Sequence, residues 1–219
     1  MVAASPSGSE LDTAVHGRDP AAQPTPAVPG VDFRGDHFAL FGLPRRFELD
    51  ADALSQSWRR LQALVHPDRF AGAGAAQMRL AMQWSTLVNT AYRCLLDPLA
   101  RAAYLCELRG VAIDAERNTA MPLEFLDEQM EWREELDAAR DSADAAALQA
   151  LRERVEQRRA EVLGLLAGLL DGPQAADAVS PADPRTRQAA AQVRILMFID
   201  KFRRDIAPSG ARKTSTPAA

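Results

Sequence analysis

Few side chains of this chain could hold a metal ion or form a disulfide. The 219 residues include two cysteines, Cys94 and Cys106, and three histidines, His16, His37 and His66, at spacings that match no metal-site pattern. Both cysteines lie on or beside apolar stripes of predicted helices, a position typical of buried thiols. We therefore expect no disulfide, no metal site and no cofactor.

Long apolar runs and an excess of positive charge are also absent. The densest apolar stretch, residues 162–170, is far shorter than the roughly 18 residues of a membrane span and contains two glycines. The net charge is −4 and the pI is about 5.5, which gives no case for nucleic acid. Residues 1–34 have neither the apolar centre of a secretory signal nor the basic character of a transit peptide. These absences predict a soluble, cytoplasmic protein with no membrane or nucleic-acid partner.

Composition divides the chain into two polar ends and a helical middle. Residues 1–34 contain five prolines and no periodic pattern, which predicts a disordered arm, and residues 207–219 predict a disordered tail. The middle is predicted to be all-α, with helices over residues 50–65, 75–96, 98–109, 122–140, 144–170 and 184–206. A break at residues 110–121 separates a first unit, 35–110, from a second, 111–206. The last three helices are expected to form a three-helix bundle.

The most informative motif is His66-Pro67-Asp68, which directly follows the amphipathic segment 50–65. Proline disfavours helical geometry in the residue before it, so the helix is expected to end near His66. One interpretation is purely structural, because proline ends many helices and aspartate often caps the next one. No second acid, nucleophile or phosphate-binding glycine loop accompanies the motif, so we do not expect a catalytic site.

The alternative interpretation of the motif is a contact point for a partner. Pro67 would stiffen the turn and leave the Asp68 carboxylate free to accept a charge-assisted hydrogen bond from an arginine. Three arginines near the motif, Arg59, Arg60 and Arg69, would form a basic collar that attracts an acidic surface.

Three segments of the first unit occur in a characteristic order. They are residues 38–44 (FALFGLP), the His-Pro-Asp motif, and residues 89–105, which contain an Asn, an Ala-Tyr pair, an Asp-Pro pair and a closing Tyr-Leu. In this order they resemble the J-domain, the module by which co-chaperones stimulate DnaK-type ATPases, over about residues 36–109. The FALFGLP opening and the closing RAAYLCELRG narrow the resemblance to the HscB family, which serves iron–sulfur cluster assembly. The resemblance implies that the partner of His66, Pro67 and Asp68 is the ATPase domain of an HscA/DnaK-type chaperone.

The helix predicted over residues 122–140 carries two apolar stripes. Phe125, Trp132 and Leu136 form the first, which is expected to face the bundle core together with residues of the other two helices. Those residues are Leu148, Leu151, Val155, Val162, Leu166, Leu169, Ile195, Ile199, Phe202 and Ile206. The second stripe, Leu126 and Met130, is displaced by about 100° from Phe125. It either widens the core face or forms an exposed recognition patch with a charged rim.

The HscB resemblance continues through this second unit, to about residue 205. Residues 125–137 (FLDEQMEWREELD) are similar to the family segment that binds the iron–sulfur scaffold IscU. The resemblance implies a scaffold contact made by Leu126, Met130, Glu131, Arg133, Glu134 and Phe198. Asp127 departs from the family pattern, because a charge replaces an apolar contact residue. No cysteine-rich module like that of some eukaryotic members is present, which favours a bacterial-type protein.

Three hypotheses follow from these patterns. The first is a co-chaperone of iron–sulfur cluster biogenesis that delivers IscU to an HscA/DnaK-type chaperone and catalyses no reaction itself. The second is a general J-domain co-chaperone with a different client, which the charge of Asp127 favours. The third is a helical scaffold protein in which His66-Pro67-Asp68 is an accidental turn. ATP turnover by the chaperone, with and without a scaffold protein, distinguishes them.

Overall fold

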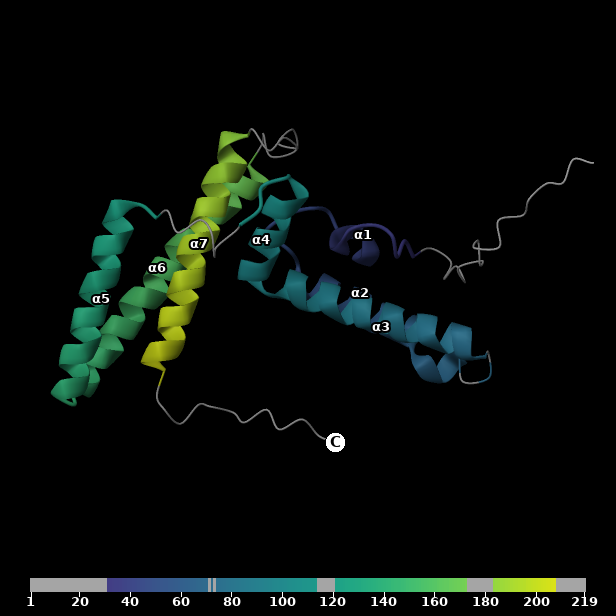
Figure 1. The fold of residues 1–219 in the computed structure, drawn as a ribbon, viewed down its shortest axis with the longest axis horizontal. Coiled ribbons are helices and arrows are strands. Elements are labelled where there is room, and N and C mark those ends of the chain that lie inside the picture. The colour runs from purple at the N-terminus through teal and green to yellow at the C-terminus, as the bar shows by residue number, and fades with distance from the viewer. Residues whose placement is uncertain (1–30, 71, 73, 114–120, 173–182, 208–219) are drawn as a thin grey trace, which may run out of the picture. The chain divides into compact units, whose positions relative to one another are not determined.

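The computed structural model describes residues 31–70, 72, 74–113, 121–172 and 183–207. Within these ranges the chain forms seven α-helices and one short 3₁₀ turn, and no β-strand. The helices are α1 (His37–Phe41), α2 (Ala51–Val65), α3 (Ala75–Leu96), α4 (Pro98–Leu108), α5 (Leu123–Asp141), α6 (Ala145–Asp171) and α7 (Pro184–Ile206) (Figure 1). The predicted all-α class and all six predicted helices are confirmed. The described residues from Asp32 onward belong to a single compact unit.

Aspartate defines the start of most of these helices. The carboxylates of Asp36, Asp50, Asp97, Asp144 and Asp183 each accept hydrogen bonds from the first backbone N–H groups of the helix that follows. These N–H groups have no partner inside the helix, so a side-chain acceptor there stabilises the first turn by roughly 1 kcal/mol. Proline occupies the first helical position of α4 and α7, where no N–H bond is lost.

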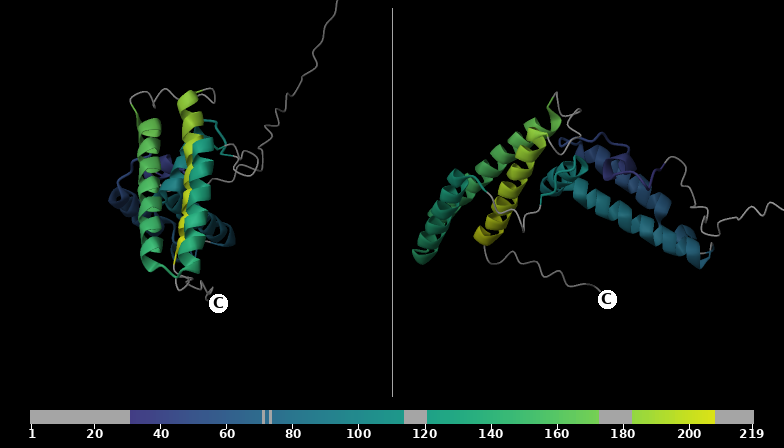
Figure 2. Two further views of the ribbon diagram at one scale, coloured as in Figure 1. Left: turned by 90° about the vertical axis from the view of Figure 1, so that its left-hand side faces the viewer. Right: turned by 45° about the horizontal axis from the view of Figure 1, so that its top comes forward.

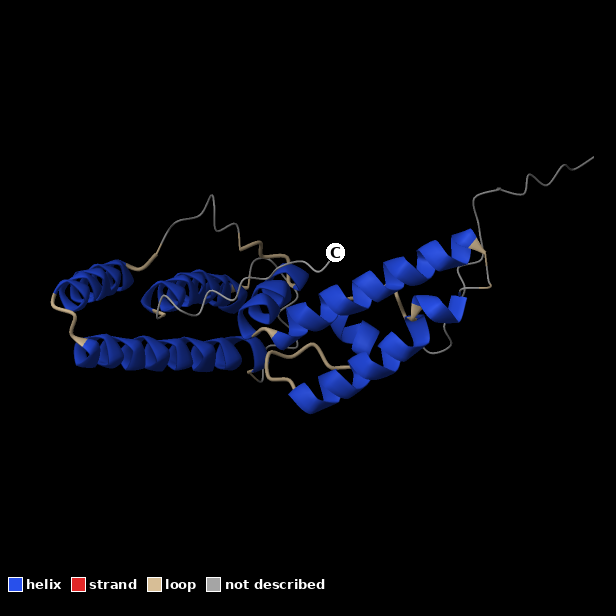
Figure 3. Ribbon diagram, turned by 90° about the horizontal axis from the view of Figure 1, so that it is seen from below, coloured by secondary structure: helices blue, strands red, loops and turns tan. Residues whose placement is uncertain are grey.

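Helices α2 and α3 form a hairpin (Figure 3), and both contact α1. The helix α1 was not predicted, and it ends at Gly42, whose positive φ of 67° suits a residue without a side chain. On α2 the residues Leu54, Leu61 and Val65, spaced at i, i+7 and i+11 on one helix face, are buried. Trp58 is only half-buried; its ring stacks on Tyr92 of α3 and its indole N–H donates to Asn89.

Most of the predicted arm, residues 1–34, and of the predicted tail, residues 207–219, lies outside the described residues. The described end of the arm includes Phe33, whose ring stacks on Trp84 of α3 with centroids 4.7 Å apart. Contacts of the helical region therefore begin before residue 35, the predicted start of the first unit.

Helices α5, α6 and α7 lie side by side, as both views of Figure 2 show. Their core contains the predicted residues of α5 and α7, and Leu151, Val155, Val162 and Leu166 of α6. Two details of the α6 prediction were wrong: Leu170 is buried in place of the half-buried Leu169, and Leu148 is also only half-buried. Adjacent leucines differ by about 100° around a helix, so only one of them can face the core.

The region that contains α1 to α4 contacts the bundle of α5, α6 and α7 at the C-terminal end of α6. The Asp171 carboxylate, almost fully buried, accepts hydrogen bonds from the backbone N–H groups of Phe47 and Glu48, each at 2.7 Å. The Arg109 side chain donates to the Leu170 carbonyl oxygen at 2.7 Å, and α4 packs against α6 and α7. The division near residue 110 stays a prediction.

A fragment that ends at Gly110 is expected to keep the α2–α3 hairpin and to stimulate a partner chaperone weakly. It should also melt at a lower temperature than the whole chain, because its α4 loses the α7 contact and the N–H groups of Phe47 and Glu48 lose Asp171. Circular dichroism and ATPase measurements on the purified fragment test this. A fragment that is unfolded at every temperature would mean that the two units share one cooperative core.

Candidate functional site: an exposed His-Pro-Asp turn and an apolar helix face

The His-Pro-Asp motif forms a tight turn directly after α2. His66 has extended backbone angles, φ −60° and ψ 128°, and residues Pro67–Phe70 form a single 3₁₀ turn. Two hydrogen bonds hold the turn: Arg69 N–H donates to the His66 carbonyl oxygen, and Asp68 N–H donates to His66 Nδ1 at 3.3 Å. An Nδ1 atom that accepts leaves the proton of the neutral imidazole on Nε2, which points away from this bond. The imidazole thus helps to fix the backbone position of Asp68.

Asp68 is the most accessible group of the turn. Its side chain is 90% exposed, and among the described residues the ionisable group that lies beside it is the His66 imidazole, with Nδ1 and Oδ2 3.6 Å apart. Among the described residues no arginine or lysine pairs with this carboxylate. The backbone is therefore fixed while the carboxylate remains available to a cationic partner, which is the property that the sequence predicts for it.

The three arginines of the predicted collar have different local roles. Arg59 and Arg60 are exposed on α2, and neither pairs with a carboxylate of the described residues. Arg69 donates from Nη1 to the Ala63 carbonyl oxygen at 3.1 Å, which satisfies one of the free carbonyls at the end of α2. All three side chains carry positive charge, but only Arg69 makes a hydrogen bond at the turn.

The predicted second stripe of α5 is exposed. Leu126 is 41% exposed and Met130 61%, whereas Phe125 is 2% exposed. The interpretation that this stripe widens the core is therefore wrong. Glu131, Arg133 and Glu134 are exposed along the stripe, so charged side chains border two apolar ones. An exposed apolar centre with a charged rim is the arrangement of a protein-interaction surface.

Phe198 of α7 connects this apolar face to the bundle core. It is half-buried, packs edge-on against Phe125 with centroids 5.6 Å apart, and lies under the Arg133 guanidinium at 5.8 Å. The structure thus brings together Leu126, Met130, Arg133 and Phe198 on one side of the bundle. Whether they bind a scaffold protein stays a prediction.

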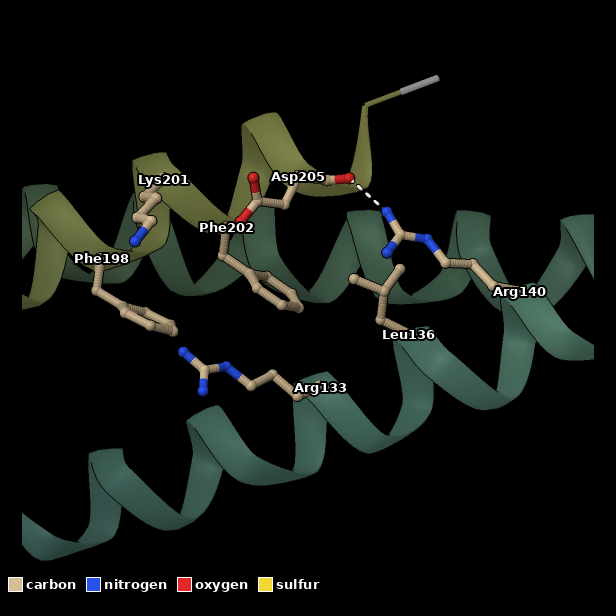
Figure 4. A pocket seen from close by; sticks show the side chains of 7 residues that line it. All are labelled: Arg133, Leu136, Arg140, Phe198, Lys201, Phe202 and Asp205. Carbon is tan, nitrogen blue, oxygen red and sulfur yellow. Dashed lines mark hydrogen bonds between the residues drawn. The ribbon is translucent and has the colours of Figure 1, made fainter. Parts of the chain in front are cut away.

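A groove between α5 and α7 continues from Phe198 and was not predicted. Its volume is about 390 Å³, and it is lined by Arg133, Leu136, Arg140, Phe198, Lys201, Phe202 and Asp205 (Figure 4). The spacing Leu126, Met130, Arg133, Asp137 and Arg140 follows a three-and-four repeat along α5, so the continuation of the stripe is visible in the sequence. The contribution of Lys201 and Phe202 is not, because it depends on how α7 packs.

Neither cysteine nor any acidic cluster forms a metal site within the described ranges. Both thiols are free, and burial raises the pKa of Cys94 and of Cys106 to about 11. A thiol with such a pKa stays protonated near neutral pH and is a poor nucleophile. No helix among these residues is long and apolar enough to cross a membrane.

A helical hairpin with a His-Pro-Asp turn, followed by a three-helix bundle with an exposed apolar face, is the arrangement of a J-domain co-chaperone with a C-terminal helical domain. Residues 121–207 match the family model described as the HSCB C-terminal oligomerisation domain. The co-chaperone protein HscB homologue of Bordetella pertussis is 48% identical over 171 residues, which cover 78% of this chain and 94% of that protein. The homologue of Burkholderia mallei is 46% identical over 176 residues, covering 80% and 94%.

Solved structures give the same result. The chaperone HscB from Vibrio cholerae matches with a TM-score of 0.64 and 38% identity, over 78% of this chain and 95% of that one. Human co-chaperone protein HscB matches with a TM-score of 0.68 and 28% identity, over 80% and 82%. The chain belongs to the HscB family of co-chaperones.

Proposed function

We propose that this chain delivers an IscU-type iron–sulfur scaffold to an HscA/DnaK-type chaperone in the cytoplasm and stimulates the ATPase of that chaperone. The chain itself catalyses no reaction. The observation that carries the proposal is the presence on one chain of two separate accessible surfaces. One is the Asp68 carboxylate on its fixed turn, and the other is the Leu126/Met130 face of the bundle.

The turn acts on the chaperone through position and charge. Asp68 accepts a charge-assisted hydrogen bond from an arginine of the ATPase domain, and Pro67 and the His66 imidazole keep its backbone in place. A contact that is stronger in the hydrolysis-competent state of the chaperone shifts its conformational equilibrium toward that state. The bundle holds the client on the same chain, which raises the client concentration near the chaperone without any new contact between them.

The rate of ATP hydrolysis by the chaperone tests whether both surfaces contribute to stimulation. ATP turnover by an HscA-type chaperone is followed alone, with this chain, with an IscU-type scaffold, and with both. Stimulation by the chain, and a further increase when the scaffold is added, are expected. No effect of the chain on turnover under any of these conditions would contradict the proposal.

A general J-domain co-chaperone with another client is the second candidate function. Asp127 favours it, because this exposed carboxylate lies beside Leu126, and a partner with an apolar surface would have to desolvate it. In the same experiment this candidate predicts stimulation by the chain that the scaffold does not increase.

Reversing the charge of Arg59 or Arg60 is expected to slow association with the chaperone by about threefold to tenfold at low salt. Both side chains are exposed and without carboxylate partners among the described residues, so their charge acts at long range on the encounter rate. Stopped-flow association rates over a salt series test this. Equal rates for variant and parent at every ionic strength would show that the collar serves solubility alone.

A further inference from the structure

The groove between α5 and α7 differs from the other helix seams of the bundle in its charge pairing. At the seams that involve α6, four arginines pair with carboxylates of the neighbouring helix: Arg154 with Glu135, Arg158 with Glu128, Arg159 with Asp200, and Arg203 with Glu156. Arg133, Arg140 and Lys201, which line the α5–α7 groove, have no carboxylate partner among the described residues. Their positive charges are therefore available to an external anion.

The groove is built as a cationic rim around an aromatic floor. The rings of Phe198 and Phe202 stack with centroids 6.1 Å apart, and Trp132 stacks on Phe202 from the core side. Arg140 donates to the backbone carbonyl oxygen of Asp205 at 2.7 Å, which positions its guanidinium at one end of the groove (Figure 4). Asp205 is the one carboxylate in the lining, so three positive charges face one negative charge. Phe202 is 4% exposed, so the accessible apolar surface of the floor comes mainly from the half-buried Phe198. This surface with a rim of unpaired cations favours a segment that carries acidic side chains beside an apolar one.

The groove is continuous with the apolar face of α5. Arg133 and Phe198 belong to both, and along α5 the exposed pair Leu126 and Met130 is followed by Arg133 and Arg140. On the opposite flank of that pair lie Asp127, Glu131 and Glu134. The exposed carboxylate of Asp137 lies between Arg133 and Arg140 along the helix, so the charges beside the apolar pair are uneven rather than fully divided. This uneven distribution favours one orientation of a charged partner.

We propose that the α5–α7 groove binds an acidic segment of the scaffold client, whose carboxylates lie between Arg140 and Lys201 while its apolar surface covers Leu126 and Met130. The inference rests on the proposed function, since it assigns to the client a second contact beside the apolar one. The chain's own residues 208–219 do not fit this chemistry, because they include Arg212 and Lys213 and no acidic residue.

Charge reversal inside and outside the groove tests the proposal on the full-length chain. Lys201→Glu is compared with Arg204→Glu, which makes the same change on the same helix but outside the groove lining. Arg140→Glu is compared with Arg140→Lys, which keeps the charge and loses only the guanidinium geometry. Binding of a purified IscU-type scaffold protein is measured by calorimetry at about 50 mM and about 500 mM salt.

The groove variants Lys201→Glu and Arg140→Glu should each weaken scaffold binding about fivefold at low salt, and the double variant about twentyfold. The control variants should remain within about twofold of the parent, and the differences should shrink at high salt. The chaperone stimulation without scaffold should stay unchanged, and so should the melting temperature of Lys201→Glu. Arg140→Glu also loses the hydrogen bond to the Asp205 carbonyl oxygen, so its binding is measured at a temperature where circular dichroism shows it fully folded. Groove and control variants that bind alike, while Leu126→Ala with Met130→Ala binds weakly, would overturn the groove assignment and leave the proposed function intact.

Two other outcomes overturn the proposal in different ways. A parent chain that binds no scaffold at all would overturn the proposed function together with the groove. Sedimentation experiments compare the oligomeric state of the parent with that of Lys201→Glu. A parent that dimerises and a variant that does not would identify a second copy of the chain, rather than the client, as the occupant of the groove.

Discussion

Asp68→Ala is expected to abolish stimulation of the chaperone ATPase while helix content and melting temperature stay close to those of the parent. The carboxylate is 90% exposed, and its neighbouring contact is the exposed His66 imidazole, so its removal exposes no core and breaks no buried bond. Surface substitutions of this kind change stability by about 0.5 kcal/mol or less. A lost charge-assisted contact to the chaperone, in contrast, removes the interaction that favours hydrolysis.

The matched variant His66→Ala tests whether the position of the Asp68 carboxylate matters in addition to its charge. It removes the Nδ1 acceptor of the Asp68 N–H bond and keeps the carboxylate, so stimulation should fall with Asp68 still present. ATP turnover, circular dichroism and thermal melting are measured on each variant. Stimulation that persists in Asp68→Ala would overturn the proposed role of the turn, and unfolding of the variant would assign the turn a structural role.

The double variant Leu126→Ala, Met130→Ala is expected to melt near the parent and to bind the IscU-type scaffold at least thirtyfold more weakly. A buried leucine costs about 2–5 kcal/mol when truncated to alanine, but these two side chains are largely in solvent already. A central interface residue, in contrast, contributes about 2 kcal/mol or more of binding free energy, which corresponds to about thirtyfold in affinity.

Calorimetric titration with the scaffold and thermal melting together test this prediction. Leu136→Ala on the same helix is the control, because this side chain is 5% exposed and its loss should lower the melting temperature strongly. Chaperone stimulation without scaffold should be the same in the double variant and the parent. A double variant that melts much lower and still binds the scaffold would place the client surface elsewhere.

Local chemistry made the long helices predictable. Asp50, Asp97-Pro98 and Asp183-Pro184 supply N-terminal caps and first-turn prolines, and regular apolar spacing specifies which face is buried. The helix α1 has five residues, too few for a 3.6-residue period to become visible, and it was missed. Leu169 and Leu170 are adjacent and both apolar, so the sequence pattern does not specify which of the two faces the core.

Contacts between distant segments were not predictable from local patterns. The sequence pattern places Asp171 just after a predicted helix and gives it no other role. In the structure its carboxylate accepts hydrogen bonds from the backbone N–H groups of Phe47 and Glu48, which are 124 and 123 residues away. The sequence allowed two interpretations of the Leu126 and Met130 stripe. Only the packing of α5 in the bundle shows that both side chains are exposed. The cationic groove likewise depends on Arg140 and Lys201, which come from different helices and share no sequence motif.

The most direct test of the central claim asks whether the two surfaces must lie on one chain. Asp68→Ala, which keeps the client face, and Leu126→Ala with Met130→Ala, which keeps the turn, are mixed in equal amounts with chaperone and scaffold. If the chain acts by bringing the client to the chaperone, the mixture should give only the basal stimulation of the double variant, without the further increase seen with the parent. Full parental stimulation by the mixture would show that the turn and the bundle act independently, and would contradict this account.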